Sequence, residues 1–231
     1  MAEAISDLEG LRAHWGLDRW IVAGHSWGAS LALGYALTHP ERTQGLMHLS
    51  GTGVTPAWHS AYYAERDRLL GPDGQQALTQ LENQWLQTGT LTSEQAYCQA
   101  AWQTDFADLT HGYELARTLL VGDLRINTTV NRLLWADARH VVEQTGWADR
   151  LPTLDVPTLV VHGAADPRPA AAASDVAWRL PQAECVVIEG AGHLPWVERP
   201  GELGQVLNAF LHTLASSPSP APVRTSSPTT C

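Results

Sequence analysis

The sequence predicts an α/β protein: a parallel sheet flanked by helices, with an inserted helical segment. Two observations indicate this architecture. Short apolar runs alternate with helical periodicities over residues 1–53 and again over residues 149–214. Residues 54–148 show helical patterns and no convincing strand. Because alternating strands and helices are typical of parallel sheets, we expect the insert to divide one sheet-containing core into two sequence segments.

The first core segment predicts a helix, a strand, a helix and a second strand. Apolar residues recur at helical spacing over residues 5–15, and Gly16 supplies a stop. A buried strand is expected over residues 19–23 and a helix over residues 27–39, which ends before Pro40. A strand over residues 44–50 completes a strand–helix–strand unit, so the two strands should be parallel.

The insert, residues 54–148, is expected to form a helical cap. Leu78, Leu81 and Trp85 share one helical face, and the stretch Thr92-Ser93-Glu94-Gln95 reads as a capping box that opens the next helix. Half of the ten tryptophans fall in the insert. We expect most of its aromatic side chains to pack within it.

The second core segment returns to alternating strands and helices. Strands are expected over residues 158–162 and 185–189, with an Ala-rich helix from residue 169 to 179 between them. A last amphipathic helix starts at Pro200. Residues 215–231 are rich in Ser, Pro and Thr and are expected to be disordered.

Composition narrows the possible partners and chemistry. The 231 residues include 24 acids against 14 basic residues, all arginine, for a net charge of −10, which argues against binding to nucleic acid or anionic membranes. The absence of lysine excludes Schiff-base chemistry. The cysteines Cys98, Cys185 and Cys231 are too far apart for a metal motif, so we expect neither a metal nor another cofactor. With no signal sequence and no membrane-spanning run, the sequence predicts a cytoplasmic protein.

Ser26 is the candidate nucleophile. It lies in Gly24-His25-Ser26-Trp27-Gly28, between a predicted strand and a predicted helix, which is the context of a nucleophile turn. We expect the two glycines to be needed because so tight a turn leaves no room for side chains beside the serine. The Trp27 amide, at the helix N-terminus, would stabilise an oxyanion.

His193 and Asp166 are the candidate base and acid. His193 follows the last predicted strand, in a glycine-rich loop at the carboxyl edge of the sheet, where active sites of open parallel sheets gather. Asp166 follows the preceding strand and would orient the imidazole. We expect His25 to pack or hydrogen-bond locally, and His162 ends its strand one element too early to be the base.

These segments resemble the α/β-hydrolase fold superfamily, and the stretch from Gly24 is similar to its prolyl-iminopeptidase-like branch, with G-x-S-W-G-x-x-L-x-L-x-Y-A before a His-Pro. HGAADPRP and GAGHLPWVERP resemble the acid and histidine segments of that superfamily. The resemblance implies serine-hydrolase chemistry and a helical cap. Aminopeptidases of this branch bind the substrate's free amine through cap carboxylates. The insert's acids offer no family pattern: Glu65, Asp67, Glu82, Glu94, Asp105, Asp108 and Glu114.

The resemblance also implies a difference near the start of the chain. Family members carry about four strands before the helix that precedes the nucleophile, and a loop there, often His-Gly-rich, donates the second oxyanion amide. We expect this sequence to begin partway through that fold, with an open sheet edge at residues 19–23 that favours oligomers and weak activity.

Three hypotheses remain open. The first is a serine hydrolase of small esters, amides or short peptides, acting through Ser26, His193 and Asp166. The second is a catalytically impaired remnant or ligand-binding module of the same fold. The third is a cofactor-free perhydrolase or acyltransferase with the same triad.

Overall fold

The computed structural model describes residues 1–123, 125–144 and 146–216, and of residues 138, 139 and 141–144 it describes the backbone alone. Its sheet has four parallel strands in the order β1-β2-β3-β4. Their bounds are Trp20–His25 (β1), Thr43–Leu49 (β2), Thr158–Gly163 (β3) and Ala183–Ile188 (β4). All four expected strands are confirmed, with ends that differ by a residue or two.

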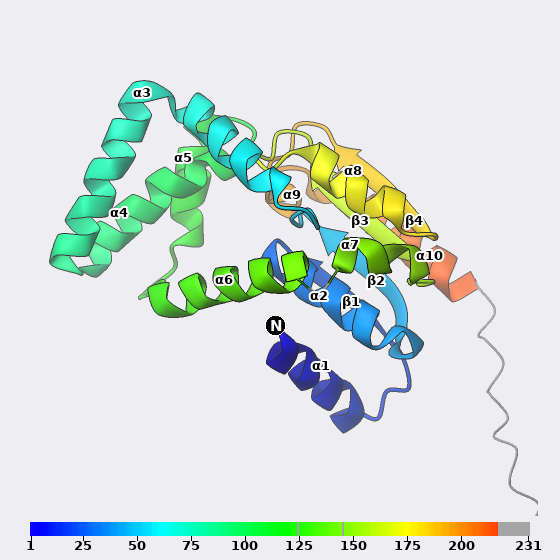
Figure 1. Ribbon diagram of the computed structural model, residues 1–231. Helices are drawn as coiled ribbons and strands as arrows, with labels where there is room; N and C mark the ends of the chain where they lie inside the picture. The colour runs from blue at the N-terminus through cyan, green and yellow to red at the C-terminus, as the bar shows by residue number, and fades with distance from the viewer. Residues whose placement is uncertain (124, 145, 217–231) are drawn as a thin grey trace, which may run out of the picture.

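Helices cover both faces of the sheet. On one face α2 (Trp27–Thr38) and α8 (Ala170–Arg179) enclose a core that includes Leu46, and α1 (Ala2–His14) packs on α2. On the other face Phe210 and Leu214 of α10 (Pro200–Ser216) pack on Met47. Figure 1 shows α8 on the near side of β3 and β4. This three-layer arrangement is the predicted α/β class.

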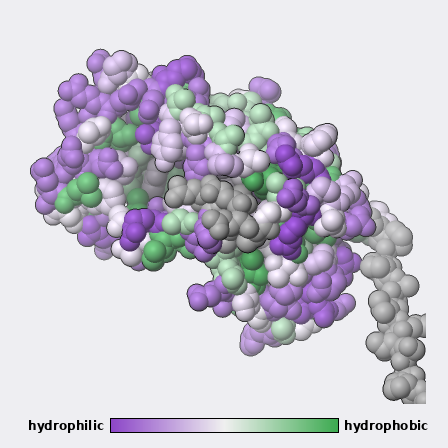
Figure 2. Space-filling view, in the orientation of Figure 1, coloured by the Kyte–Doolittle hydropathy of each residue, from purple (hydrophilic) through white to green (hydrophobic). Residues whose placement is uncertain are grey.

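The segment between β2 and β3 is helical in its described part, as expected. Its helices are α3 (Ala57–Thr88), α4 (Leu91–Trp102), α5 (Leu109–Leu119), α6 (Thr128–Gln144) and α7 (Trp147–Arg150). In Figure 1, α3 to α5 extend away from the sheet and the helices that cover it, and α6 runs back toward α2. Figure 2 shows mainly hydrophilic residues over α3 to α5 on this face. That separation is consistent with a cap, whose boundaries stay a prediction.

Short 3-10 helices complete the described structure: η1 (Pro40–Arg42), η2 (Gln103–Asp105) and η3 (Leu151–Thr153), together with the short helix α9 (Pro195–Glu198). Helix α3 kinks at Gly71, which has φ 62° and precedes Pro72. The kink follows from the missing amide of Pro72 and the steric restriction that proline places on the residue before it.

The capping box expected at Thr92 is wrong. Helix α4 begins two residues earlier, and the Thr90 side chain accepts a hydrogen bond from the Ser93 amide. Gly89 ends α3 in the left-handed conformation, which leaves Thr90 as the first residue able to cap the next helix. Gln95, the residue that would close the expected box, instead donates a hydrogen bond to the Gly122 carbonyl.

At the chain's end, α10 includes residues 215 and 216, which the sequence assigned to the tail. The rest of the predicted disordered tail, with Cys231, lies outside the described residues. None of the helices that the structure describes is both long and apolar enough to cross a membrane.

Candidate active site

Ser26 lies at a sharp turn between β1 and α2. Its backbone has φ 55° and ψ −120°, in the left-handed half of φ space that side chains other than glycine rarely adopt. The Ser26 amide donates a hydrogen bond to the Leu49 carbonyl at the end of β2, which fixes the turn against the sheet. Such strain, held by surrounding structure, is typical of a nucleophile turn.

The two glycines of the turn have different roles. A Cβ on Gly24 would lie 1.9 Å from the Gly28 carbonyl oxygen, so β1 and α2 can approach this closely only with glycine there. A Cβ on Gly28 would have nothing within 4 Å, and Gly28 has no positive φ. The expectation is therefore confirmed for Gly24 and wrong for Gly28, whose contribution to the turn is its backbone.

Asp166 and His193 meet at the carboxyl edge of the sheet. Asp166 lies in the loop after β3, and His193 lies in the loop after β4. His193 Nδ1 donates a hydrogen bond of 2.6 Å to Asp166 Oδ2, and both side chains are buried. Burial by itself would raise the pKa of Asp166, but the His193 hydrogen bond and the nearby Arg168 charge outweigh it and lower this pKa to about 2.

Glycines allow the loops to meet. A Cβ on Gly163, the last residue of β3, would lie 2.0 Å from the Gly192 carbonyl oxygen. A Cβ on Gly192 would lie 2.3 Å from the Asp105 carbonyl oxygen. That same Asp105 carbonyl accepts a hydrogen bond of 2.7 Å from the His193 amide. The histidine loop is therefore held between two elements: Asp105 of the helical segment binds it on one side, and the end of β3 packs against it on the other.

Arg168 connects the candidate acid to the helical segment. Its guanidinium donates to Asp166 Oδ1 at 3.2 Å and to Asp105 Oδ1 at 2.8 Å, and its amide donates to Asp166 Oδ1 at 2.9 Å. His162 Nε2 donates to the Arg168 carbonyl at 2.8 Å. His162 therefore supports the acid loop from β3, a role that the sequence did not predict. The sequence interpretation missed Arg168, although a basic residue two positions after the acid was visible in it.

His25 packs against His193, so its hydrogen-bond partner lies in the loop after β4 and not in its own turn. Its Nε2 donates to the His193 carbonyl at 3.0 Å, and the two ring centroids are 4.5 Å apart. Burial and the neighbouring His193 charge lower the pKa of His25 to about 4, so it is neutral at pH 7. This contact places the residue next to Ser26 directly beside the candidate base.

Ser26 itself makes no hydrogen bond with His193 in the described part of the chain. The structure thus pairs Asp166 with His193 and joins the Ser26 turn to the His193 loop through His25. Hydrogen bonds between nucleophile and base are often long without substrate and tighten when it binds. Trp27 begins α2, where first-turn amides have no intrahelical acceptor.

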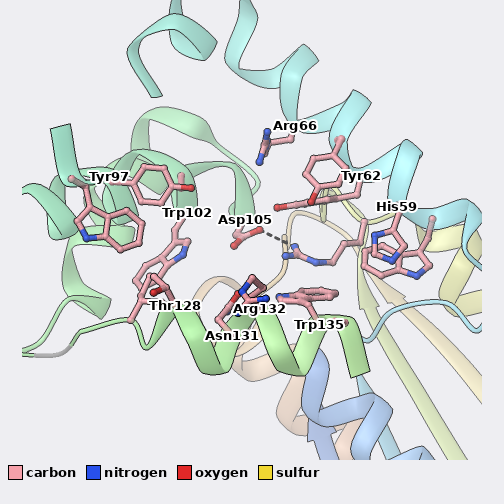
Figure 3. A pocket seen from close by; sticks show the side chains of 17 residues that line it. His59, Tyr62, Arg66, Tyr97, Trp102, Asp105, Thr128, Asn131, Arg132 and Trp135 are labelled. Atoms are coloured by element: carbon pink, nitrogen blue, oxygen red, sulfur yellow. Dashed lines mark hydrogen bonds and ion pairs between the residues drawn. The ribbon is translucent and has the colours of Figure 1, made fainter. Parts of the chain in front are cut away.

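A cavity of about 820 Å³ opens between α3, α4 and α6 and reaches Arg168. Figure 3 shows Tyr62 and Arg66 extending into it from α3, and Asn131, Arg132 and Trp135 from α6, with Asp105 between them. Seven of its 17 lining residues are Trp or Tyr, so the expectation that these rings pack within the insert holds only in part. Trp58 is nearly buried and Tyr62 packs on Arg168.

Five of the seven acids named from the insert are paired with arginines. The pairs are Glu65–Arg68, Asp67–Arg66, Glu94–Arg125, Asp105–Arg168 and Glu114–Arg117. Asp108 accepts from the His111 amide at the start of α5. Among the seven acids, Asp105 alone lines the cavity. Within the described residues, no group of three or more His, Cys, Asp or Glu side chains could hold a metal ion.

Residues 1–200 match the family model described as "alpha/beta hydrolase fold". The chain belongs to the alpha/beta hydrolase fold family. It is 51% identical over 45 residues to a probable proline iminopeptidase of Leptolyngbya boryana, and 43% identical over 72 residues to a proline iminopeptidase of Xylella fastidiosa. These matches cover 20% and 31% of this chain but only 14% and 23% of those relatives.

Solved structures share the fold of this alpha/beta hydrolase. The crystal structure of VinJ superposes with a TM-score of 0.63 at 20% identity, over 91% of this chain and 71% of that one. A proline iminopeptidase from Mycobacterium smegmatis gives a TM-score of 0.58 at 22% identity, over 91% of this chain and 70% of that one. At these identities the likeness establishes the fold alone.

Proposed function

We propose that this alpha/beta hydrolase cleaves a carboxylic ester or amide bond through an acyl-enzyme formed on Ser26. The observation that carries the proposal is the Asp166–His193 hydrogen bond of 2.6 Å beside the strained Ser26 turn. Because its pKa is lowered to about 2, Asp166 is ionised at neutral pH. An ionised carboxylate can stabilise the imidazolium that forms on His193.

The steps follow from these roles. His193 takes the proton of the Ser26 hydroxyl as its oxygen attacks the carbonyl carbon, and then gives that proton to the departing alcohol or amine. Water, deprotonated by His193, attacks the acyl-enzyme and releases the carboxylic acid, with the proton returning to Ser26. The Trp27 amide donates to the oxyanion in both steps, at the positive end of the α2 dipole.

Replacing Ser26 tests the nucleophile. Ser26→Ala should lower the kcat for a p-nitrophenyl ester by about a million-fold, because the oxygen that forms the acyl-enzyme is gone. Labelling by a fluorophosphonate probe should disappear in the same variant. Ser30→Ala, in the same helix, is the matched control and should keep both signals. Unchanged turnover in a folded Ser26→Ala protein would place the chemistry elsewhere.

An aminopeptidase is the second candidate, favoured by the names of the proline iminopeptidases that match in sequence. Such an enzyme needs a carboxylate for the substrate's ammonium group. Asp105 is the carboxylate that lines the cavity, and Arg168 already pairs with it at 2.8 Å. The geometry therefore favours the broader ester or amide hydrolase.

Comparing a substrate that has a free amine with its N-acetylated form distinguishes the two candidate functions. We expect N-acetyl-alanine and alanine p-nitroanilides to react at rates within about tenfold of each other, because the carboxylate among the described lining residues, Asp105, is already paired with Arg168. The measurement is kcat/KM for both compounds. A rate for the free amine that exceeds the acetylated one by several orders of magnitude would establish the aminopeptidase instead.

A further inference from the structure

The cavity between α3 and α6 has a positive charge that contrasts with the acidic chain. The chain carries a net charge of −10, yet the cavity is lined by Arg66, Arg132 and Arg168 against the single carboxylate of Asp105. Arg168 is balanced by Asp105 and Asp166, at 2.8 and 3.2 Å. Among the lining residues, the remaining positive charges are those of Arg132 and of Arg66, whose partner Asp67 does not line the cavity.

These two guanidinium groups come from opposite walls, Arg66 from α3 and Arg132 from α6 (Figure 3). Arg66 contacts Asp67 at 3.4 Å, longer than a strong charge-assisted hydrogen bond, and its buried Nε has no acceptor. In the part of the chain that the structure describes, no carboxylate lies within ion-pair distance of Arg132. Both arginines thus retain hydrogen-bonding capacity for an anionic ligand.

Aromatic side chains form a large part of the remaining walls and suit a flat apolar group. Tyr62, Trp102 and Trp135 face the cavity from three different helices (Figure 3). A volume of about 820 Å³ is within the range of small-molecule sites, and low-dielectric walls strengthen the attraction between an arginine and an anion. Guanidinium groups bind carboxylates with two parallel hydrogen bonds, which adds geometric selectivity.

We propose that this cavity selects substrates that carry a carboxylate on a flat, apolar group, held between Arg66 and Arg132. The inference rests on the proposed hydrolase function, since it names the substrate class of that site. Ser26 and His193 are not among the residues that line the cavity, but Asp105 and Arg168 on its wall contact the His193 loop and Asp166, so the cavity lies next to the candidate triad. A substrate with a free ammonium group would meet two positive charges there instead of a carboxylate.

Binding can be measured apart from catalysis in Ser26→Ala protein. The ligands are phenylacetate, its neutral isostere phenylacetamide and the cation phenethylamine, followed by the fluorescence of the cavity tryptophans. We expect phenylacetate to bind about ten- to a hundredfold more tightly than phenylacetamide, as charge-assisted hydrogen bonds allow, and phenethylamine to bind most weakly. Equal affinity for the three ligands would overturn the inference.

Arginine variants assign the selectivity to this cavity. Arg66→Gln and Arg132→Gln should each reduce phenylacetate affinity by about tenfold and leave phenylacetamide affinity unchanged. Arg68→Gln is the matched control, because Arg68 lies on α3 outside the cavity and pairs with Glu65. A loss of phenylacetate affinity as large in Arg68→Gln as in the cavity variants would contradict the assignment.

Hydrolysis rates of two esters test the anion selectivity separately from the hydrolase activity. The active protein is given the p-nitrophenyl half-ester of glutaric acid and the neutral p-nitrophenyl pentanoate, and kcat/KM should favour the half-ester by about tenfold or more. Hydrolysis of both esters without this preference would overturn the anion selectivity and leave the hydrolase intact. Selective phenylacetate binding without hydrolysis of either ester would reject the hydrolase and support an anion-binding cavity.

Discussion

At the scale of single residues, Asp166 and His193 could be predicted because each follows a strand, and parallel strands bring their carboxyl ends to one edge. Arg168 and Asp105 could not be predicted as partners. Their ion pair joins residues 63 positions apart, in the 3-10 helix η2 and in the loop after β3, and no local pattern encodes that distance. The sequence indicated candidate residues for the chemistry, whereas the network that holds Asp166 could be seen only in the fold.

Replacing Asp166 tests the acid at this scale. Asp166→Asn should lower kcat by about ten-thousand-fold with little change in KM, because an amide would hold His193 in the wrong tautomer. Asp175→Asn is the matched control, since Asp175 forms a surface ion pair with Arg179. Steady-state kinetics on an activated ester measure both variants. Turnover of Asp166→Asn near that of the unmodified protein would mean that another carboxylate orients the base.

At the scale of elements, strands and helices of the core followed from periodicity, because apolar spacing decides which residues can be buried. Errors occurred where two local signals competed. Thr90 and Thr92 are equally good caps by residue type, and the left-handed Gly89 decided between them. Likewise both glycines of the Ser26 turn fit the motif, but only the backbone approach of β1 and α2 distinguishes Gly24 from Gly28.

The turn glycines give a prediction about this element. Gly24→Ala should destabilise the protein by more than about 2 kcal/mol and remove activity, because its Cβ meets backbone that cannot rotate away. Gly28→Ala should fold normally, and alanine's better helix propensity should stabilise α2 by up to about 1 kcal/mol. Urea unfolding and ester turnover measure both effects. Equal loss of stability in the two variants would contradict the steric argument.

At the scale of the whole molecule, the order of the four described strands leaves β1 at one edge of the sheet. It pairs with β2, and no described strand pairs with its other side. The resemblance of the sequence to the family predicted this edge. Ala23 is exposed on β1 and Val22 is buried, so the edge has no charged side chain in the middle to discourage pairing with another chain.

The open edge predicts association between copies of this chain. We expect sedimentation velocity to show dimers or larger species that increase with protein concentration, formed by β1 pairing across two molecules. Ala23→Lys should shift the distribution toward monomer, because a charge on an edge strand must be desolvated when a second strand pairs with it. Ala209→Lys places the same charge on exposed α10 and controls for net charge. A chain that stays monomeric at all concentrations, or that responds equally to both substitutions, would show that β1 is not the associating surface.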